Sequence, residues 1–218
     1  MSKPKQSMAQ RLMEAQVAID NSLNNPTILN AVAAFGYDAA RLQAGRALYD
    51  EVMGLAAAQE REYGEQYEAT AVVNAAWGTA DLAYKKALKI SRVVFKGNQK
   101  ARNALGLSGS RKKTLSGWIN QATNFYTNLL NTPDLIAAMT PYSYDQAKLA
   151  AEAALVQAVV AANAAQDRER GEAQEATQMR DAKMDELDQW TADYKAIAQV
   201  ALSDSPQQLE QLGWIVPS

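Results

Sequence analysis

A run of basic side chains is the feature of this sequence with the clearest chemistry. Between Leu82 and Pro133 the chain has no Asp or Glu, but it has ten cations. They are Lys85, Lys86, Lys89, Arg92, Lys96, Lys100, Arg102, Arg111, Lys112 and Lys113. Clustered Lys and Arg attract polyanions, either the phosphates of a nucleic acid or the headgroups of an anionic membrane. We call residues 85–113 the basic segment and consider it a candidate polyanion-binding surface.

The same charges have a second interpretation, inside the protein. An acidic stretch lies later in the chain and contains Asp181, Asp185, Glu186, Asp188 and Asp193. If the two stretches lay on neighbouring helices, their charges would fix the register and orientation of these helices, as flanking charges do in coiled coils. The formal net charge is only −2, because acidic residues on both sides offset the basic segment. The sequence leaves both interpretations open.

Catalytic and metal-binding chemistry is poorly represented. The chain has no Cys and no His, which excludes disulfides and thiolate catalysis and removes the commonest general base and transition-metal ligand. The carboxylate pairs Glu65/Glu68 and Glu172/Glu175 lie among other charged residues, which is typical of a solvated helix face. Residues 108–114 are basic and glycine-containing but lack the spacing of a P-loop. We therefore expect no enzymatic activity, no metal site and no cofactor.

The sequence contains an internal repeat. Pro133 lies 107 residues after Pro26, and this single offset relates many further positions without a gap. Examples are Tyr37-Asp38 with Tyr144-Asp145, Arg61-Glu62 with Arg168-Glu169, Gly64 with Gly171, and Leu105-Gly106 with Leu212-Gly213. Such self-similarity indicates a gene duplication. We predict two helical repeats, residues 1–107 and 108–218, which pack together as one structural domain.

Each repeat is expected to contain only helices, because the chain is rich in Ala and has only 6 Pro and 11 Gly. A first helix covers about 8–23 in the first repeat. Asn25-Pro26 and Thr132-Pro133 then read as an N-cap followed by Pro at the first position of a short helix. Asp38 and Asp145 read as N-caps of a very long helix. Gly106 and Gly213 read as left-handed glycines that stop a brief last helix.

The long helices are expected over about 38–95 and 145–202, which contain no Pro. An unbroken helix of about sixty residues would be about 90 Å long. A helical hairpin with its tip near Gly64 or Gly171 is the alternative, but the neighbouring residues are good helix formers, so we favour a continuous helix in which Gly permits close backbone approach. The predicted fold is an all-α, internally duplicated, elongated helical bundle with two long antiparallel helices and shorter bracing helices.

Aromatic residues at helical spacing are expected to form the core. These are Trp77, Tyr84, Trp118, Phe125, Tyr126, Trp190 and Tyr194. Val73, Ala80, Ala87 and Val94 recur every seven residues and suggest a coiled-coil seam. The corners Phe35/Tyr37 and Tyr142/Tyr144 are expected to close the ends of the bundle as hydrophobic staples.

The function expected from these features is structural. We expect a non-catalytic scaffold or adaptor that acts through helix faces, by binding a protein partner or by self-association. The alternative is a module that binds nucleic acid or anionic lipid through the basic segment. The N-terminal residues lack the apolar core of a signal peptide, and the apolar stretch Ala150–Ala165 is short and weakly hydrophobic. We therefore expect a cytoplasmic protein without a transmembrane segment.

Overall fold

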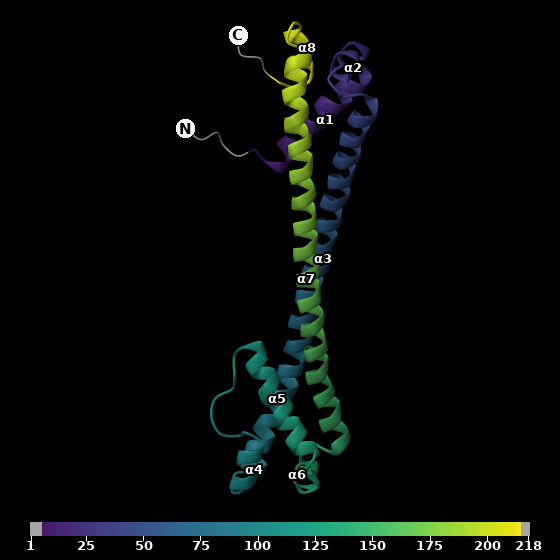
Figure 1. Cartoon of the computed structure of the whole chain (residues 1–218). Coiled ribbons are helices and arrows are strands. Elements are labelled where there is room, and N and C mark those ends of the chain that lie inside the picture. The colour runs from purple at the N-terminus through teal and green to yellow at the C-terminus, as the bar shows by residue number, and fades with distance from the viewer. Residues whose placement is uncertain (1–5, 215–218) are drawn as a thin grey trace. The chain divides into compact units, whose positions relative to one another are not determined.

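The computed structural model describes residues 6–214, and every element assigned in that range is helical. In chain order these are α1 (Met8–Asn24), α2 (Pro26–Ala33), α3 (Ala39–Val94), α4 (Gln99–Ala104), α5 (Leu115–Leu130), α6 (Pro133–Met139), the 3-10 helix η1 (Thr140–Tyr142), α7 (Gln146–Ala201) and α8 (Pro206–Gln211) (Figure 1). The prediction of an all-α protein is confirmed. The two long helices, α3 and α7, pack against each other.

Local chemistry sets the helix boundaries where the sequence predicted them. The side-chain oxygen of Asn25 accepts a hydrogen bond from the Thr27 amide at 3.0 Å. Asp38 and Asp145 cap α3 and α7 by accepting from amides three residues further on, at 2.9 and 2.8 Å. Each cap supplies an acceptor to the otherwise unpaired first amides of its helix. Gly106 and Gly213, with φ of 59° and 81°, take the left-handed conformation expected after a helix end.

The cap predicted at Thr132 is only half correct. Thr132 occupies the N-cap position of α6, followed by Pro133, but its side chain makes no capping hydrogen bond. Its hydroxyl instead donates to the carbonyl of Asn128 at 2.9 Å, in the turn before α6. The hydroxyl is therefore engaged by the preceding helix, an alternative open to Thr but not to the carboxylate of an Asp cap.

The centres of α3 and α7 are helical through Gly64 and Gly171, so a hairpin tip at these glycines is excluded. The expectation that these glycines permit close backbone approach is wrong. A Cβ placed on either one would meet no atom within 4 Å in the described part of the chain. The glycine of α3 that does sit at a close contact is Gly45, where a Cβ would lie 2.3 Å from Cζ2 of Trp190.

The helices form two compact units. Unit 1 contains α1, α2, the part of α3 up to Glu62, the part of α7 from Ala173, and α8. Unit 2 contains the rest of α3, α4, α5, α6, η1 and the part of α7 up to Glu172. Each unit thus combines helices from both predicted repeats. The repeat boundary between residues 107 and 108 describes sequence similarity and stays a prediction.

The core of unit 1 is built around Tyr37, which lies between α2 and α3, and the aromatic rings of α7. Tyr37 and Tyr194 are buried, with ring centroids 4.9 Å apart, and the Trp190 ring lies 5.4 Å from Tyr194. The buried hydroxyl of Tyr194 shares a hydrogen bond with the hydroxyl of Ser22 on α1. Aliphatic side chains of α2 and α8, such as Ile28 and Leu209, pack in the same cluster.

In unit 2, α5 packs on α3 and α7 (Figure 1). Tyr84, Trp118, Phe125 and Tyr126 are almost fully buried and meet edge to face or tilted, the arrangements that aromatic pairs prefer. The predicted aromatic core is thus confirmed, except that Trp77 and Trp190 are half-buried.

The staple prediction is half correct, because in each corner only the second aromatic ring is buried. Tyr37 and Tyr144 are 2% and 4% exposed. Phe35 and Tyr142 are about half exposed, at 49% and 50%. The residue between the two rings is left-handed in both corners, Gly36 with φ of 86° and Ser143 with φ of 64°, and this turn directs the two rings differently.

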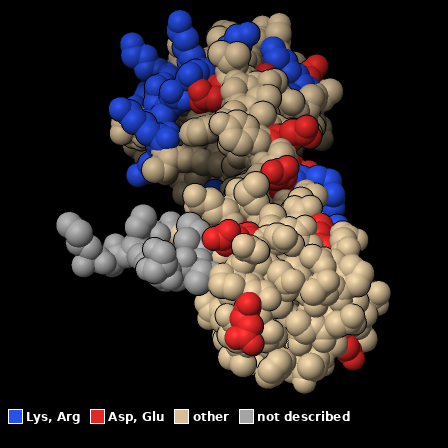
Figure 2. Space-filling view, turned by 90° about the horizontal axis from the view of Figure 1, so that it is seen from above, with Lys and Arg blue, Asp and Glu red and all other residues tan. Residues whose placement is uncertain are grey.

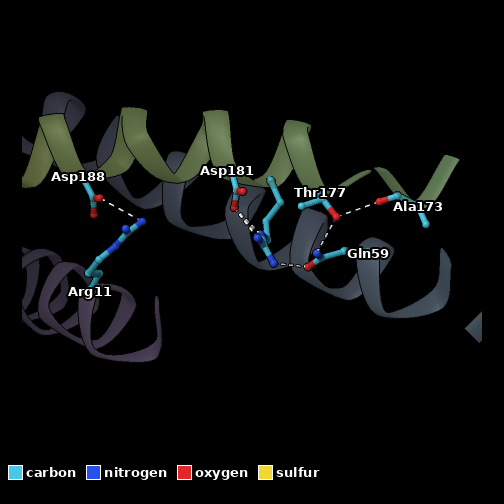
Figure 3. A network of polar contacts seen from close by, with 7 residues as sticks. Arg11, Gln59, Ala173, Thr177, Asp181 and Asp188 are labelled. Atoms are coloured by element: carbon cyan, nitrogen blue, oxygen red, sulfur yellow. Dashed lines mark hydrogen bonds and ion pairs between the residues drawn. The ribbon is translucent and has the colours of Figure 1, made fainter. Parts of the chain in front are cut away.

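Polar side chains cross from α3 to α7 within the packed surface of each unit. In unit 1, Nε2 of Gln59 donates to Oγ1 of Thr177 at 2.9 Å, and Arg180 donates to the Gln59 oxygen and to Asp181 (Figure 3). In unit 2, Nε2 of Gln166 donates to Oγ1 of Thr70, also at 2.9 Å. Such partly buried hydrogen bonds favour one register of two packed helices over others.

Candidate anion-binding site

The basic segment runs from the C-terminal part of α3 through α4 and the following loop to the start of α5, all in unit 2. Eight of its ten cations are exposed, and Arg102 and Arg111 are half-buried. The exposed ones are Lys85, Lys86, Lys89, Arg92, Lys96, Lys100, Lys112 and Lys113. Figure 2 shows Lys and Arg side chains gathered in one area of the face it draws, with few Asp or Glu among them.

Asp81 on α3 is the carboxylate that pairs with this segment. One of its oxygens lies 2.6 Å from Nζ of Lys85, and the other lies 2.6 Å from Nη1 of Arg111 and accepts from the Trp118 indole at 2.9 Å. Burial alone would raise the pKa of Asp81, but the hydrogen bonds from Lys85 and Trp118 and the charge of Arg111 outweigh burial and hold the pKa below its usual value of 3.8. Asp81 is therefore ionised and already fully engaged at neutral pH.

Most of the other cations have no acidic partner. Within residues 6–214, the ion pairs of the basic segment are those of Lys85 and Arg111 with Asp81. The acidic stretch makes its own pairs inside unit 1: Asp188 with Arg11 at 3.1 Å and Asp181 with Arg180 (Figure 3), and Glu186 with Lys183 at 2.8 Å. The acidic stretch and the basic segment thus belong to different units, and each ion pair that they form is made within its own unit. The interpretation in which they neutralise each other finds no support.

The loop before α5 is held in place by Arg92. Its Nε donates to the carbonyl of Leu107 at 3.1 Å, and its Nη2 donates to that of Gly109 at 3.3 Å. The amide of Lys112 donates to Oε1 of Gln121 on α5 at 2.9 Å. Gly109, with φ of 90°, permits the sharp turn that these contacts require. The loop that carries three consecutive cations therefore has a defined conformation.

A cavity of about 460 Å³ lies between α3, this loop and the start of α5. It is lined by Trp77, Asp81, Arg92, Gly109, Ser110, Arg111, Lys112, Lys113 and Trp118. The sequence identified its cations as a group but assigned both Trp residues to the core. Helical spacing predicts that Trp77 lies on the inward face of α3, but it does not predict that a cavity lies next to this side chain.

A smaller cavity of about 280 Å³ lies in the corresponding place of unit 1. Two of its lining residues are equivalent, at the 107-residue offset, to residues of the larger cavity: Arg11 to Trp118, and Asp188 to Asp81. The equivalent pairs also make equivalent contacts, because Asp81 binds Trp118 and Asp188 binds Arg11. Two ion pairs cross the lining of the smaller cavity, Arg11 with Asp188 and Lys195 with Glu14, both at 3.1 Å. The smaller cavity therefore has one carboxylate for each cation. The larger cavity has four cations, Arg92, Arg111, Lys112 and Lys113, and one carboxylate, Asp81.

The carboxylate pairs considered for acid/base or cation chemistry are exposed. Glu65, Glu68, Glu172 and Glu175 all lie on the solvent side of α3 and α7. Their exposure agrees with their interpretation as a solvated face.

Among the residues that the structure describes, one helix is long and apolar enough to cross a membrane by length and composition alone. This is α7, in which an 18-residue window has a mean hydropathy of 1.2, and 22% of that window is buried. Core helices of soluble proteins meet the same criterion, so this observation is weak evidence about a membrane.

Comparison with known proteins adds no name to this site. No protein-family model, curated protein or solved structure matches the chain. The function must therefore be argued from the residues described above.

Proposed function

We propose that the basic segment binds a polyanion through its phosphate groups. The observation that carries this proposal is the exposure of eight cations, of which all but Lys85 lack an acidic partner within residues 6–214. Phosphates of a nucleic acid and phosphate headgroups of a lipid offer the same chemistry to such a surface. Lys86, Lys89 and Lys96 are the residues to test, because they are exposed and engage no ion pair in the described chain. Lys85 and Arg92 are less suitable, since they hold Asp81 and the loop.

The test is to replace Lys86, Lys89 and Lys96 together by Gln and to measure binding to two probes. One probe is a fluorescent single-stranded oligonucleotide, and the other is a vesicle containing phosphatidylserine. The matched control replaces Arg61, Arg168 and Arg170 by Gln, which changes the net charge equally at exposed positions outside the basic segment. We expect the first variant to lose binding with an unchanged melting temperature, and the control to bind normally. The proposal fails if wild type binds neither probe, or if both variants lose binding equally.

A second candidate function is a non-catalytic scaffold or adaptor that acts through helix faces. Its support is the number of large apolar side chains that the long helices expose, including Tyr67 at 84%, Leu82 at 61% and Val72 at 57%. Large apolar side chains exposed on one helix are available for protein contacts. Sedimentation equilibrium of wild type and of a Val72→Gln, Leu82→Gln variant tests self-association, with Met13→Gln on α1 as the control. A monomer at every concentration, with no partner captured by wild type, would remove this candidate.

We also propose that the chain is an internal duplication in which α3 and α7 run antiparallel. Within unit 1, Gly45 lies against Trp190, and Gln59 bonds to Thr177. A later residue of α3 thus contacts an earlier residue of α7, as expected for two antiparallel helices. The bond from Gln166 to Thr70 in unit 2 joins the two positions equivalent to Gln59 and Thr177 at the 107-residue offset. The same contact made twice by equivalent residues is what a duplicated helical pair would produce.

A further inference from the structure

The cavity beside the basic segment is large enough to hold a small molecule. Its volume of about 460 Å³ falls within the usual range of ligand sites. It lies wholly within unit 2, between the α3 residues Trp77 and Asp81, the loop at Gly109 to Lys113, and Trp118 on α5.

One side of the cavity is cationic. Lys112 and Lys113 are exposed and engage no ion pair in residues 6–214, so their ammonium groups are available to an anion. Arg92 is fixed by the two loop carbonyls and presents its charge beside them. Arg111 is bound to Asp81, which leaves three cations for a ligand. Ammonium and guanidinium groups in this arrangement suit a phosphate, which accepts several charge-assisted hydrogen bonds.

The other side of the cavity is aromatic. The rings of Trp77 and Trp118 have centroids 6.1 Å apart. Trp118 is only 1% exposed and forms the floor, whereas Trp77 is half-buried and offers ring surface to the cavity. A flat heterocycle gains stacking energy on such a ring, whatever its hydrogen-bonding pattern.

One donor of the cavity lining, the indole N–H of Trp77, is buried and has no acceptor among the described residues. Buried polar groups are almost always paired, so this N–H requires a partner. A ligand acceptor, or a water molecule held with the ligand beside Trp77, would supply it.

The corresponding cavity of unit 1 provides the contrast. At the position of Trp118 it has Arg11, bound to Asp188, and Lys195 is bound to Glu14. Its charges are balanced and its volume is smaller, about 280 Å³. The two units thus share a place for a cavity, but only in unit 2 is it both aromatic and rich in unpaired cations.

We propose that the unit 2 cavity binds a nucleotide, with the base on Trp77 and the phosphate held by Arg92, Lys112 and Lys113. The inference rests on the proposed affinity of the basic segment for phosphate and names the ligand. A free nucleotide and one nucleotide of a single strand present the same chemistry. Lys86, Lys89 and Lys96 lie outside the cavity lining, so the site and the remaining basic surface can be tested separately.

The experiment is isothermal titration of the whole chain with adenosine 5′-monophosphate, adenosine and inorganic phosphate. We expect one site per chain for the monophosphate. We expect at least about tenfold weaker binding of adenosine and of phosphate, since each lacks one half of the recognition. A variant with Lys112→Gln and Lys113→Gln, both at exposed positions, should weaken monophosphate binding about tenfold or more. Lys100→Gln, an exposed cation of the same segment outside the lining, is the matched control and should bind as wild type.

Trp77→Leu tests the stacking surface and should weaken the monophosphate about tenfold while leaving phosphate binding unchanged. If this variant melts early, Trp77→Phe keeps an aromatic ring and should retain most of the affinity. Failure of wild type to bind the monophosphate, or equal binding by the Lys112/Lys113 variant, overturns the site. If oligonucleotide or vesicle binding persists in that case, the proposed function stands without it. Tighter binding of a dinucleotide than of the monophosphate assigns the site to a strand, and equal binding assigns it to a free nucleotide.

Discussion

Replacing Gly45 by Ala tests the packing of α3 against α7 in unit 1. A Cβ at this position would lie 2.3, 2.5 and 2.6 Å from three carbons of the Trp190 ring. The indole has little room to retreat, because its ring packs against Tyr37 at 5.8 Å and Tyr194 at 5.4 Å between centroids. The equivalent positions in unit 2 are Glu152 and Ala83, so there a larger residue stands where Gly45 is and a smaller one where Trp190 is.

Two effects of opposite sign set the size of the change. Ala is favoured over Gly in a helix by about 1 kcal/mol. Overpacking a filled core destabilises a protein by about 1–3 kcal/mol. Because the Cβ contacts at Gly45 would be so short, we expect the overpacking cost of Gly45→Ala to lie toward the upper end of this range. Gly54 on the same helix is the matched control, because a Cβ there would meet nothing within 4 Å of the described chain. The helix term is common to both variants, so Gly45→Ala should be about 1–3 kcal/mol less stable than Gly54→Ala.

The assay is thermal and urea-induced unfolding of both variants, followed by circular dichroism. For a chain of this size the expected difference corresponds to roughly 2–12 °C in the melting midpoint. Adding Trp190→Leu to each variant should shrink the difference, since the clash disappears with the ring. If Gly45→Ala were as stable as Gly54→Ala, Trp190 would not lie against Gly45 and the described packing of unit 1 would be refuted.

Three further predictions concern single polar groups. Gln59→Ala should cost about 1–3 kcal/mol and Gln166→Ala less, because Gln59 is 7% exposed and bonds to both Thr177 and Arg180, whereas Gln166 is half-buried and bonds to Thr70. Urea unfolding measures both losses. Asp81→Asn should destabilise the protein at neutral pH. Since the folded pKa of Asp81 is lowered, this difference should vanish as pH falls through that pKa, below its usual 3.8. Burial raises the pKa of Glu152 above its usual value of 4.5, despite the hydrogen bond that its carboxylate accepts from Tyr126. The protein therefore loses stability as pH rises through this pKa and Glu152 becomes ionised. We expect Glu152→Gln to be more stable than wild type at neutral pH but not below about pH 4.

Each of these predictions has a definite contrary result. Equal losses for the two glutamines would mean that the degree of burial does not decide the cost of the hydrogen bond to threonine. A stability difference for Asp81→Asn that persists in acid would mean that the loss is steric and not electrostatic. A destabilised Glu152→Gln at neutral pH would mean that the hydrogen bond from Tyr126 outweighs the burial of the charge.

The sequence predicted the helices well because their ends depend on neighbouring residues. Asn25, Asp38 and Asp145 cap helices by bonding to amides two or three positions away, and Gly106 ends one by its own conformation. These interactions are local, so the residue type and its position are enough to predict them. Thr132 shows the limit, because its hydroxyl can bond backward to the preceding helix as readily as it can cap the next.

The division into units and the cavity depend on contacts distant in the sequence, which the pattern did not reveal. The repeat boundary between residues 107 and 108 stays a prediction, and it gave no indication that each compact unit takes one part of α3 and one part of α7. Trp77 was assigned to the core, but it is half-buried and lines a cavity together with the core residue Trp118. One feature of the sequence could have pointed to this cavity. Trp118 is equivalent to Arg11 of the other repeat, and such a difference in residue type marks a position at which the two repeats diverge.

The salt dependence of oligonucleotide binding tests the central claim, that exposed cations of the basic segment contact phosphates, most directly. For a single strand, the logarithm of the affinity falls with the logarithm of the salt concentration by about 0.7 for each phosphate neutralised. Fluorescence anisotropy of wild type and of the Lys86, Lys89 and Lys96 to Gln variant should therefore give slopes that differ by about 2. Identical slopes for the two proteins would contradict the claim.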